Sequence, residues 1–276
     1  MIDAHRHFWR YSPSTHGWID ESMPMLKRDF LPGEAMALDH KDPDEGCVAV
    51  QALHSLEETR WLLESCADHA SLRGVVGWVD LCSPTAADLL AEFAAHPRFV
   101  GVRHLVQDEA DPQFLSRPLF RRGLLELGAR QLCFDLLLRR PQRAAAIDLV
   151  RAFPNLTFVV DHLAKPDIAE GEIDPWHRQM HELARSENVF CKLSGLCTQA
   201  DVKSWQPGHI APYVDIALET FGPARLLFGS DYPVCTLAGP ARRVVASHLD
   251  FLRRLSPTEY RAITHTNAVR VYGLKP

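Results

Sequence analysis

The chain begins with the stretch Ile2-Asp3-Ala4-His5-Arg6-His7-Phe8, in which two histidines lie two positions apart. On a β-strand, side chains alternate between the two faces, so the imidazoles of His5 and His7 would point the same way and Arg6 the other way. Two convergent imidazoles at a strand end suit a divalent metal ion or the polarisation of a carbonyl group. The chain contains 14 histidines, however, so an exposed pair at a frayed terminus explains this stretch equally well when it is taken alone.

The composition is that of an ordinary globular protein. Of the 276 residues, 46% are hydrophobic and 24% are charged, which is enough for a large core. A net charge of -5 without a basic block favours neither nucleic acid nor an anionic membrane surface as a partner. The N-terminal residues lack the pattern of a signal peptide, and no apolar run approaches the roughly 20 residues that span a bilayer. The 7 cysteines form no C-x-x-C motif, which favours reduced thiols and a cytoplasmic location.

Short apolar runs bounded by Gly, Pro or charged residues predict eight buried parallel strands. These runs are Ile2–His7, Cys47–Ala52, Gly74–Val79, Phe99–Arg103, Leu132–Leu137, Leu156–Asp161, Val189–Leu193 and Leu226–Ser230. Amphipathic segments, several of them opening with proline or a capping residue, predict helices between and after the strands. They are Leu56–His69, Thr85–Ala95, Pro118–Ala129, Pro141–Phe153, Asp174–Glu187, Pro212–Phe221, Pro240–Leu255 and Pro257–Tyr272.

This strict alternation predicts a parallel sheet, and eight β/α units in this length predict a closed (β/α)₈ TIM barrel that forms one domain over residues 1–276. An open doubly wound sheet is the alternative, but no G-x-G-x-x-G or Walker motif follows a strand. The longest loops, 9–30, 105–117, 164–173 and 194–210, all follow strands. In a barrel they would lie on the C-terminal face, where active sites form.

Polar residues at the predicted strand ends are therefore the candidate site residues. His5 and His7 end the first strand, His162 ends the sixth and Asp231 ends the eighth. A buried histidine would explain His162 alone, and a helix N-cap would explain Asp231 alone. Because all four would lie at the same end of one barrel, we expect them to form a site, and three imidazoles with one carboxylate suit Zn²⁺ or a similar ion.

Other residues near strand ends have two interpretations. Arg103 and His104 end the fourth strand with opposite parity, and we expect Arg103 to point inward and orient an anionic or carbonyl oxygen, with a salt bridge at the rim as the alternative. His54 and His104 are further candidates for substrate binding. Trp18 in the first long loop is a candidate pocket wall, although packing would explain it as well.

Two charged residues on inner strands are expected to act as partners of other groups. Lys192 on the seventh strand would be an ion-pair partner inside the barrel, and Asp135 on the fifth would be a partner or an acceptor for a sugar hydroxyl. The chain contains no G-x-S-x-G motif and no cysteine with a convincing histidine partner, so nucleophilic catalysis by serine or cysteine is not indicated.

Six motifs in this order resemble the amidohydrolase superfamily, and within it the branch of sugar-acid lactonases that includes L-fuconolactonase and L-rhamnonolactonase. They are Asp3-Ala4-His5-Arg6-His7-Phe8-Trp9, Val75-Val76-Gly77-Trp78-Val79-Asp80-Leu81, Gly101-Val102-Arg103-His104, Asp161-His162-Leu163-Ala164-Lys165-Pro166, Lys192-Leu193-Ser194-Gly195-Leu196 and Phe228-Gly229-Ser230-Asp231-Tyr232-Pro233-Val234. The tail Asn267-Ala268-Val269-Arg270-Val271-Tyr272 fits the same branch. Arg6 stands where Gln is frequent in this branch, and Ala164 stands where Gly is common.

The resemblance implies a barrel that opens lactone rings with water and takes a small sugar lactone as its substrate. It implies that Asp231 is the general base. It also implies that His5, His7 and His162 polarise the carbonyl, either directly or through one Zn²⁺. Metal use varies within the branch, so the resemblance leaves open whether a metal is needed.

Three alternative functions remain open at this stage. They are a lactonase for a carboxylated lactone from aromatic breakdown, a metal-dependent decarboxylase of the same superfamily, and a binding barrel without catalysis. The oligomeric state and the identity of the sugar cannot be predicted from the sequence.

Overall fold

The computed structural model describes residues 1–35 and 45–275, and parallel strands form its centre. The strands of the described residues follow one another around a single sheet in chain order. They are β1 (Ile2–Arg6), β2 (Gly46–Val50), β3 (Leu72–Gly77), β4 (Phe99–His104), β5 (Cys133–Leu136), β6 (Phe158–Val160), β7 (Val189–Leu193) and β8 (Leu226–Phe228). Because a parallel connection needs a crossover, each strand is followed by a segment that runs back along the outside of the sheet.

The sheet closes between its first and last strands. The backbone N–H of Asp231 donates to the carbonyl of His5 at 2.9 Å, and the N–H of His7 donates to the carbonyl of Tyr232 at 2.8 Å. The Asp3 carboxylate strengthens this seam, since it accepts the N–H of Ser230 at 2.8 Å. The predicted (β/α)₈ TIM barrel is therefore confirmed.

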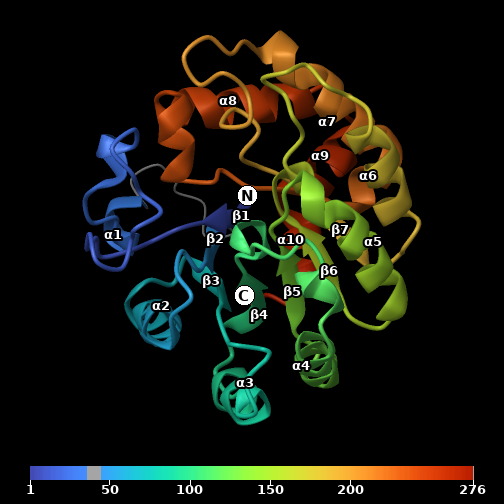
Figure 1. The fold of residues 1–276 in the computed structure, drawn as a ribbon. Helices are drawn as coiled ribbons and strands as arrows, with labels where there is room; N and C mark the ends of the chain where they lie inside the picture. The colour runs from blue at the N-terminus through green and yellow to red at the C-terminus, as the bar shows by residue number, and fades with distance from the viewer. Residues whose placement is uncertain (36–44, 276) are drawn as a thin grey trace.

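Helices surround the strands as a ring (Figure 1). Their bounds are α1 (Pro32–Ala35), α2 (Leu56–Asp68), α3 (Ala86–Ala94), α4 (Pro118–Ala129), α5 (Arg143–Ala152), α6 (Trp176–Ala184), α7 (Pro207–Phe221), α8 (Ala241–Leu252), α9 (Pro257–Arg261) and α10 (Asn267–Tyr272). The largest apolar cluster lies between the strands and this ring. Apolar side chains on one face of each helix and one face of each strand build it.

The inside of the barrel has two layers. The lower layer is apolar, and residues of and after α10, including Ala268 and Leu274, pack there against strand residues such as Val48 and Phe190. The upper layer is charged and contains Asp135, Arg103 and other fully buried groups. Helix α10 lies close to the strands in Figure 1, and it separates the charged layer from solvent at the lower end.

A β-bulge in β1 turns the histidines into the barrel. Between Asp3 and Arg6 the strand advances three residues while its partner β2 advances two, from Cys47 to Ala49. Ile2 and Ala4 pack in the inner apolar layer, so strict alternation along β1 would turn His5 outward. The extra residue shifts the alternation, as bulges beside functional sites often do, and His5 then faces inward.

The observed elements are mostly shorter than the predicted ones. Strand β6 ends at Val160 and β8 ends at Phe228, so His162 and Asp231 follow their strands in turns instead of ending them. The helix expected from Pro212 begins earlier, at Pro207, because proline suits the first helical position. The single helix predicted for Pro257–Tyr272 is divided into α9 and α10 by a π-helical turn at Ala262–Thr266.

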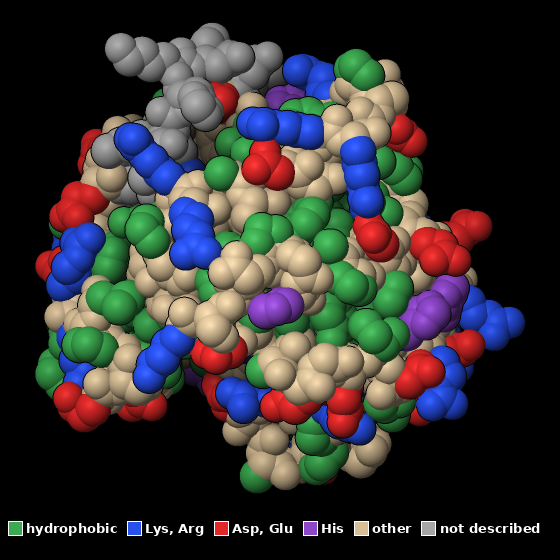
Figure 2. All heavy atoms as spheres, turned by 90° about the horizontal axis from the view of Figure 1, so that it is seen from above, with side chains coloured by type: hydrophobic (Ala, Val, Ile, Leu, Met, Phe, Trp, Pro, Cys, Tyr) green, Lys and Arg blue, Asp and Glu red, His purple; other side chains and the backbone are tan. Residues whose placement is uncertain are grey.

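The long loop after β1 is packed and not extended. Trp9 and Phe30 pair through two backbone hydrogen bonds of 2.9 Å, and their rings join Ile19, Leu26 and Ala52 in a small apolar cluster. Among the described residues, no helix is long and apolar enough to cross a membrane. On the face seen in Figure 2, acidic and basic side chains are interspersed.

Candidate active site

A cavity of about 490 Å³ opens at the C-terminal ends of the strands. His7, Arg103, His162 and Asp231 line its inner wall. Trp18, from the packed loop after β1, lines it as well. The cavity therefore collects five of the predicted site residues, as expected for the C-terminal face of a barrel.

Another part of the cavity wall is polar and carries positive charge. Gln107, Arg139, Lys165 and Gln199 come from the loops after β4, β5, β6 and β7. Sequence reasoning did not select any of them, because each lies in a loop whose path the sequence pattern does not fix.

The imidazoles of His5 and His7 and the carboxylate of Asp231 lie within a few ångströms of one another. Nε2 of His5 is 3.1 Å from Nε2 of His7, and Asp231 Oδ1 is 3.5 Å from His7 Nε2 and 3.8 Å from His5 Nε2. Nδ1 of His7 lies 2.8 Å from the carbonyl of Val50, to which it can only donate. This bond fixes the orientation of the His7 ring and directs its other nitrogen, Nε2, toward the carboxylate.

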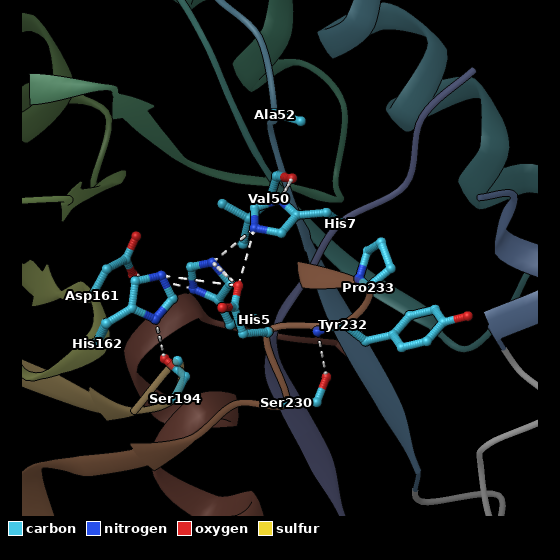
Figure 3. A network of polar contacts seen from close by, with 12 residues as sticks. His5, His7, Val50, Ala52, Asp161, His162, Ser194, Ser230, Tyr232 and Pro233 are labelled. Atoms are coloured by element: carbon cyan, nitrogen blue, oxygen red, sulfur yellow. Dashed lines mark hydrogen bonds and ion pairs between the residues drawn. The ribbon is translucent and has the colours of Figure 1, made fainter. Parts of the chain in front are cut away.

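His162 lies near the same carboxylate. Its Nε2 lies 3.9 Å from Asp231 Oδ1, and its Nδ1 is hydrogen-bonded to Ser194 Oγ at 2.8 Å. In Figure 3 the rings of His5, His7 and His162 point toward one another. We call these three residues the cavity histidines.

Gly195 leaves room for the His162 ring. A Cβ atom at this position would lie 2.5 Å from His162 Nδ1, and the glycine has a φ of +64°. Both the close approach and the left-handed backbone exclude a larger residue.

A left-handed turn places His162 in the cavity. Four consecutive residues, His162 to Lys165, have φ between 50° and 54°, a conformation that costs roughly 1–2 kcal/mol for each L-residue. Two buried side chains from the helix ring hold the turn: Trp176 Nε1 donates to the carbonyl of Leu163 at 2.7 Å, and Arg143 donates to the carbonyls of Ala164 and Lys165. Strain that the surroundings hold in this way is typical of functional sites.

Arg103 points inward, as predicted, and it is held by ion pairs and hydrogen bonds inside the barrel. Its guanidinium donates to Asp161 Oδ2 at 3.0 Å and to Gln51 Oε1 at 3.1 Å. It also lies 3.3 Å from Nε2 of His5. Its position in the cavity wall is therefore fixed by acceptors that the sequence analysis had not selected.

Lys192 and Asp135 belong to the same charged layer and are completely buried. Nζ of Lys192 is 2.5 Å from Asp135 and 2.9 Å from Asp161, which confirms the expected ion-pair role of the lysine. Asp135 also accepts the hydroxyl of Tyr272 at 3.0 Å. Two aspartates and two cations thus balance in the interior, which a buried ionic network requires.

Burial and charge set the protonation of the site. Burial lowers the pKa of His5 well below its ordinary value and that of His162 to about 4, so both rings are neutral at pH 7. Burial alone would raise the pKa of the Asp231 carboxyl. His162 and the hydrogen bond from His7 outweigh that effect and hold the pKa below its ordinary value. Asp231 is therefore a carboxylate at neutral pH.

The donor atoms fit one divalent ion. Ligand atoms of His5, His162 and Asp231 all lie within 4.8 Å of one another, and His7 Nε2 lies beside them. Four ligands in a tetrahedron around Zn²⁺ at 2.0–2.1 Å would be separated by about 3.3 Å. The His5–His7 separation and the three separations to Asp231 run from 3.1 to 3.9 Å. Imidazole and carboxylate donors are also the set that such an ion prefers.

His54 and His104, which we call the flank histidines, lie outside the wall of the main cavity. His104 is buried against Phe114, its Nε2 is 2.7 Å from Glu109, and its Nδ1 accepts from Trp78. His54 Nε2 accepts the backbone N–H of Leu105 at 2.9 Å. His54 also lines a shallower hollow of about 340 Å³ that shares Trp18 and Leu105 with the main cavity.

Comparisons with known proteins agree with this geometry. A family model described as Amidohydrolase matches residues 2–274. An L-fucono-1,5-lactonase from Burkholderia multivorans is 38% identical to this chain, covering 99% of this chain and 96% of that protein. One from Burkholderia ambifaria is also 38% identical, covering 86% of this chain and 82% of that protein.

A solved structure is similar as well. An amidohydrolase from Burkholderia multivorans with bound Zn has a TM-score of 0.91 at 37% identity, and the alignment covers 99% of each chain. From the match of the family model over nearly the whole chain, and from these relatives, we conclude that the protein belongs to the amidohydrolase family.

Proposed function

We propose that this protein hydrolyses the lactone ring of a sugar acid, such as an L-fucono- or L-rhamnono-lactone. One observation carries the proposal: a chain 38% identical to L-fucono-1,5-lactonases along nearly its full length gathers a buried carboxylate and three imidazoles at one end of a polar cavity. A lactone is an activated ester, so one base and one electrophilic group suffice to open it.

Asp231 is the general base in this proposal. Its carboxylate faces the cavity, and its low pKa keeps it ionised at the pH of a cell. A water molecule beside Asp231 would give its proton to Oδ1 while its oxygen attacks the lactone carbonyl carbon. Water attack of this kind requires the base within hydrogen-bond reach of the water, and the cavity leaves space for one.

The cavity histidines polarise the carbonyl. The imidazoles of His5 and His162 are neutral and can donate a hydrogen bond without carrying a buried charge, and Arg103 contributes a fixed positive charge at 3.3 Å from His5. These groups stabilise the negative charge that develops on the carbonyl oxygen. His5, His7, His162 and Asp231 would also hold one Zn²⁺ or similar ion, which supplies Lewis-acid polarisation of the same carbonyl when bound.

Of the remaining candidates, Trp18 lines the cavity, whereas His54 and His104 lie outside its wall. The indole of Trp18 lines the cavity, and its Nε1 has no hydrogen-bond partner within the described residues. This donor is buried, and a ring hydroxyl of a bound sugar would satisfy it. His54 would act less directly, because it holds the wall segment at Leu105, and so would His104, which is bonded to Glu109 and Trp78.

The test is a pH-indicator screen of purified protein against sugar lactones, with and without a chelator. Acid release above the spontaneous rate on one stereochemical series supports a sugar lactonase. Loss of that activity in the chelator arm, with recovery on adding Zn²⁺, supports a required metal. No acid release from any sugar lactone refutes the proposal, and the screen then turns to carboxylated lactones and to decarboxylation.

A further inference from the structure

The left-handed turn after β6 brings a second ionisable side chain into the cavity. Residues three apart on a helical turn share one face, so His162 and Lys165 both line the cavity while Leu163 and Ala164 are buried on the other side. The turn that Trp176 and Arg143 hold extends as far as Lys165.

The ammonium of Lys165 has a neutral partner. Its Nζ donates to Gln107 Oε1 at 2.5 Å, and within residues 1–35 and 45–275 no carboxylate forms an ion pair with it. Burial lowers the pKa of Lys165 to about 8, with Arg139 and Arg103 acting in the same direction and Asp231 opposing them. A lysine that lines a cavity without a salt bridge, and with a pKa near the working pH, is suited to give up a proton.

The chemistry of ring opening leaves a task for such a group. When the water attacks, Asp231 takes the water proton. The acyl C–O bond then breaks, and its electron pair stays on the ring oxygen as an alkoxide. An alkoxide is a poor leaving group unless it receives a proton as it departs, and the neutral rings of His5 and His162 do not supply an acid of suitable strength.

We propose that Lys165 is a further catalytic residue of this site: its Nζ donates a proton to the ring oxygen as the acyl C–O bond breaks. This inference rests on the proposed lactonase function. The protons balance, because Asp231 gains one from water and Lys165 loses one to the alkoxide. Afterwards Asp231 releases its proton to solvent and Lys165 recovers one, and the products are the open-chain hydroxy acid as its carboxylate and one proton.

The experiment compares two substrates on the same variants. One is a sugar 1,4-lactone that the enzyme hydrolyses, and the other is the thiolactone with sulfur in place of the ring oxygen and the same hydroxyls. A thiol has a pKa of about 8.5, so a thiolate leaves without prior protonation, while an alkoxide does not. The ratio of the two rates in one preparation does not depend on the fraction of folded protein.

Replacing the lysine should separate the two substrates. We expect Lys165→Met to lower kcat on the lactone by about 10²–10³-fold, the range of general acid catalysis, and to lower kcat on the thiolactone far less. Arg139→Met removes a neighbouring cation from the same wall and should change both rates by the same factor. If Lys165→Met slows both substrates equally, or slows neither, Lys165 is not the acid.

A second readout uses the lactone alone. In the wild type, activity should decline on the alkaline side as Lys165 loses its proton. Lys165→Arg keeps the charge but releases a proton only above pH 12 or so, so this variant should be slower and its alkaline decline should move to higher pH. A decline that stays in place contradicts the inference. A wild-type protein that hydrolyses neither substrate refutes the proposed function instead, so the two failures are distinguishable.

Discussion

Two groups of histidines lie at the same end of this barrel, and they differ in what their ring nitrogens do. In the cavity histidines, one nitrogen of each ring is held by a protein group such as Val50 or Ser194, and the other faces Asp231. In the flank histidine His104, both ring nitrogens are occupied, by Trp78 and by Glu109. Histidines at strand ends therefore belong to a site only when a nitrogen is left facing the cavity.

The same difference predicts that the cavity histidines act in the reaction and that the flank histidines stabilise the fold. The cavity histidines converge on a carboxylate, so their removal should affect reaction rates. The flank histidines stack on aromatic rings, with ring centres 4.7 Å apart for His104 and Phe114 and 5.2 Å apart for His54 and Trp78. Their removal should affect stability.

The largest expected effect is on the carboxylate that the cavity histidines face. Asp231→Asn keeps the size of the side chain but removes the base, so we expect kcat for lactone hydrolysis to fall by about 10³-fold, within the range of general base catalysis. Thermal unfolding should remain cooperative near the wild-type temperature. Asp108→Asn is the matched control, since Asp108 is an exposed carboxylate in the same cavity wall, and it should change kcat little. Near-normal activity of Asp231→Asn would refute the assignment of the base.

A smaller effect is expected from replacing a flank histidine, and it should appear in the free energy of unfolding and not in kcat. His104→Ala removes a ring that is 7% exposed together with its bond to Glu109, which should cost about 2–3 kcal/mol. For a chain of this size that lowers Tm by roughly 5–10 °C, measured by calorimetry. In the folded variant kcat should be close to the wild-type value. His162→Ala should show the reverse pattern, and a large loss of kcat in His104→Ala with an unchanged Tm would end the distinction between the two groups.

The smallest effect is expected at Trp18, which lines both the main cavity and the shallower hollow beside His54. Trp18→Phe keeps an aromatic wall and removes the Nε1 donor. One hydrogen bond to a neutral hydroxyl contributes about 0.5–1.5 kcal/mol, so KM should rise by roughly 2- to 12-fold with kcat unchanged. Steady-state kinetics on a lactone with and without the relevant hydroxyl checks this. On the lactone that lacks the hydroxyl, the wild type and Trp18→Phe should have the same KM.

Much of the site could be predicted because it follows the strand order. His5 and His7 were placed on one face by alternation, and Arg103 was expected to point inward from its parity; both predictions match the structure. What alternation could not predict is the β-bulge between Asp3 and Arg6, which decides that the shared face of the histidines is the inner one.

Other parts of the site depended on backbone conformations that have no sequence signal of their own. Lys165 reaches the cavity only because four successive non-glycine residues are left-handed, and nothing in Leu163-Ala164 favours that conformation. The frequent Gly at position 164 in the resembling branch is the one hint, because glycine adopts positive φ without strain. Similarly, Gln51 was not selected, although it holds Arg103 in place.

The sequence by itself determined the (β/α)₈ architecture, the end of the barrel that carries the site, and the residue types available there. Those properties follow from local periodicity and from the chirality of parallel crossovers. Only the tertiary structure decided which polar residues face the cavity and which bond to one another, such as His104 with Glu109 or Lys192 with Asp135. The reason is physical: the direction of a side chain beyond a strand end depends on turns, bulges and partners contributed by segments far away in the chain, and these are fixed only when the barrel closes.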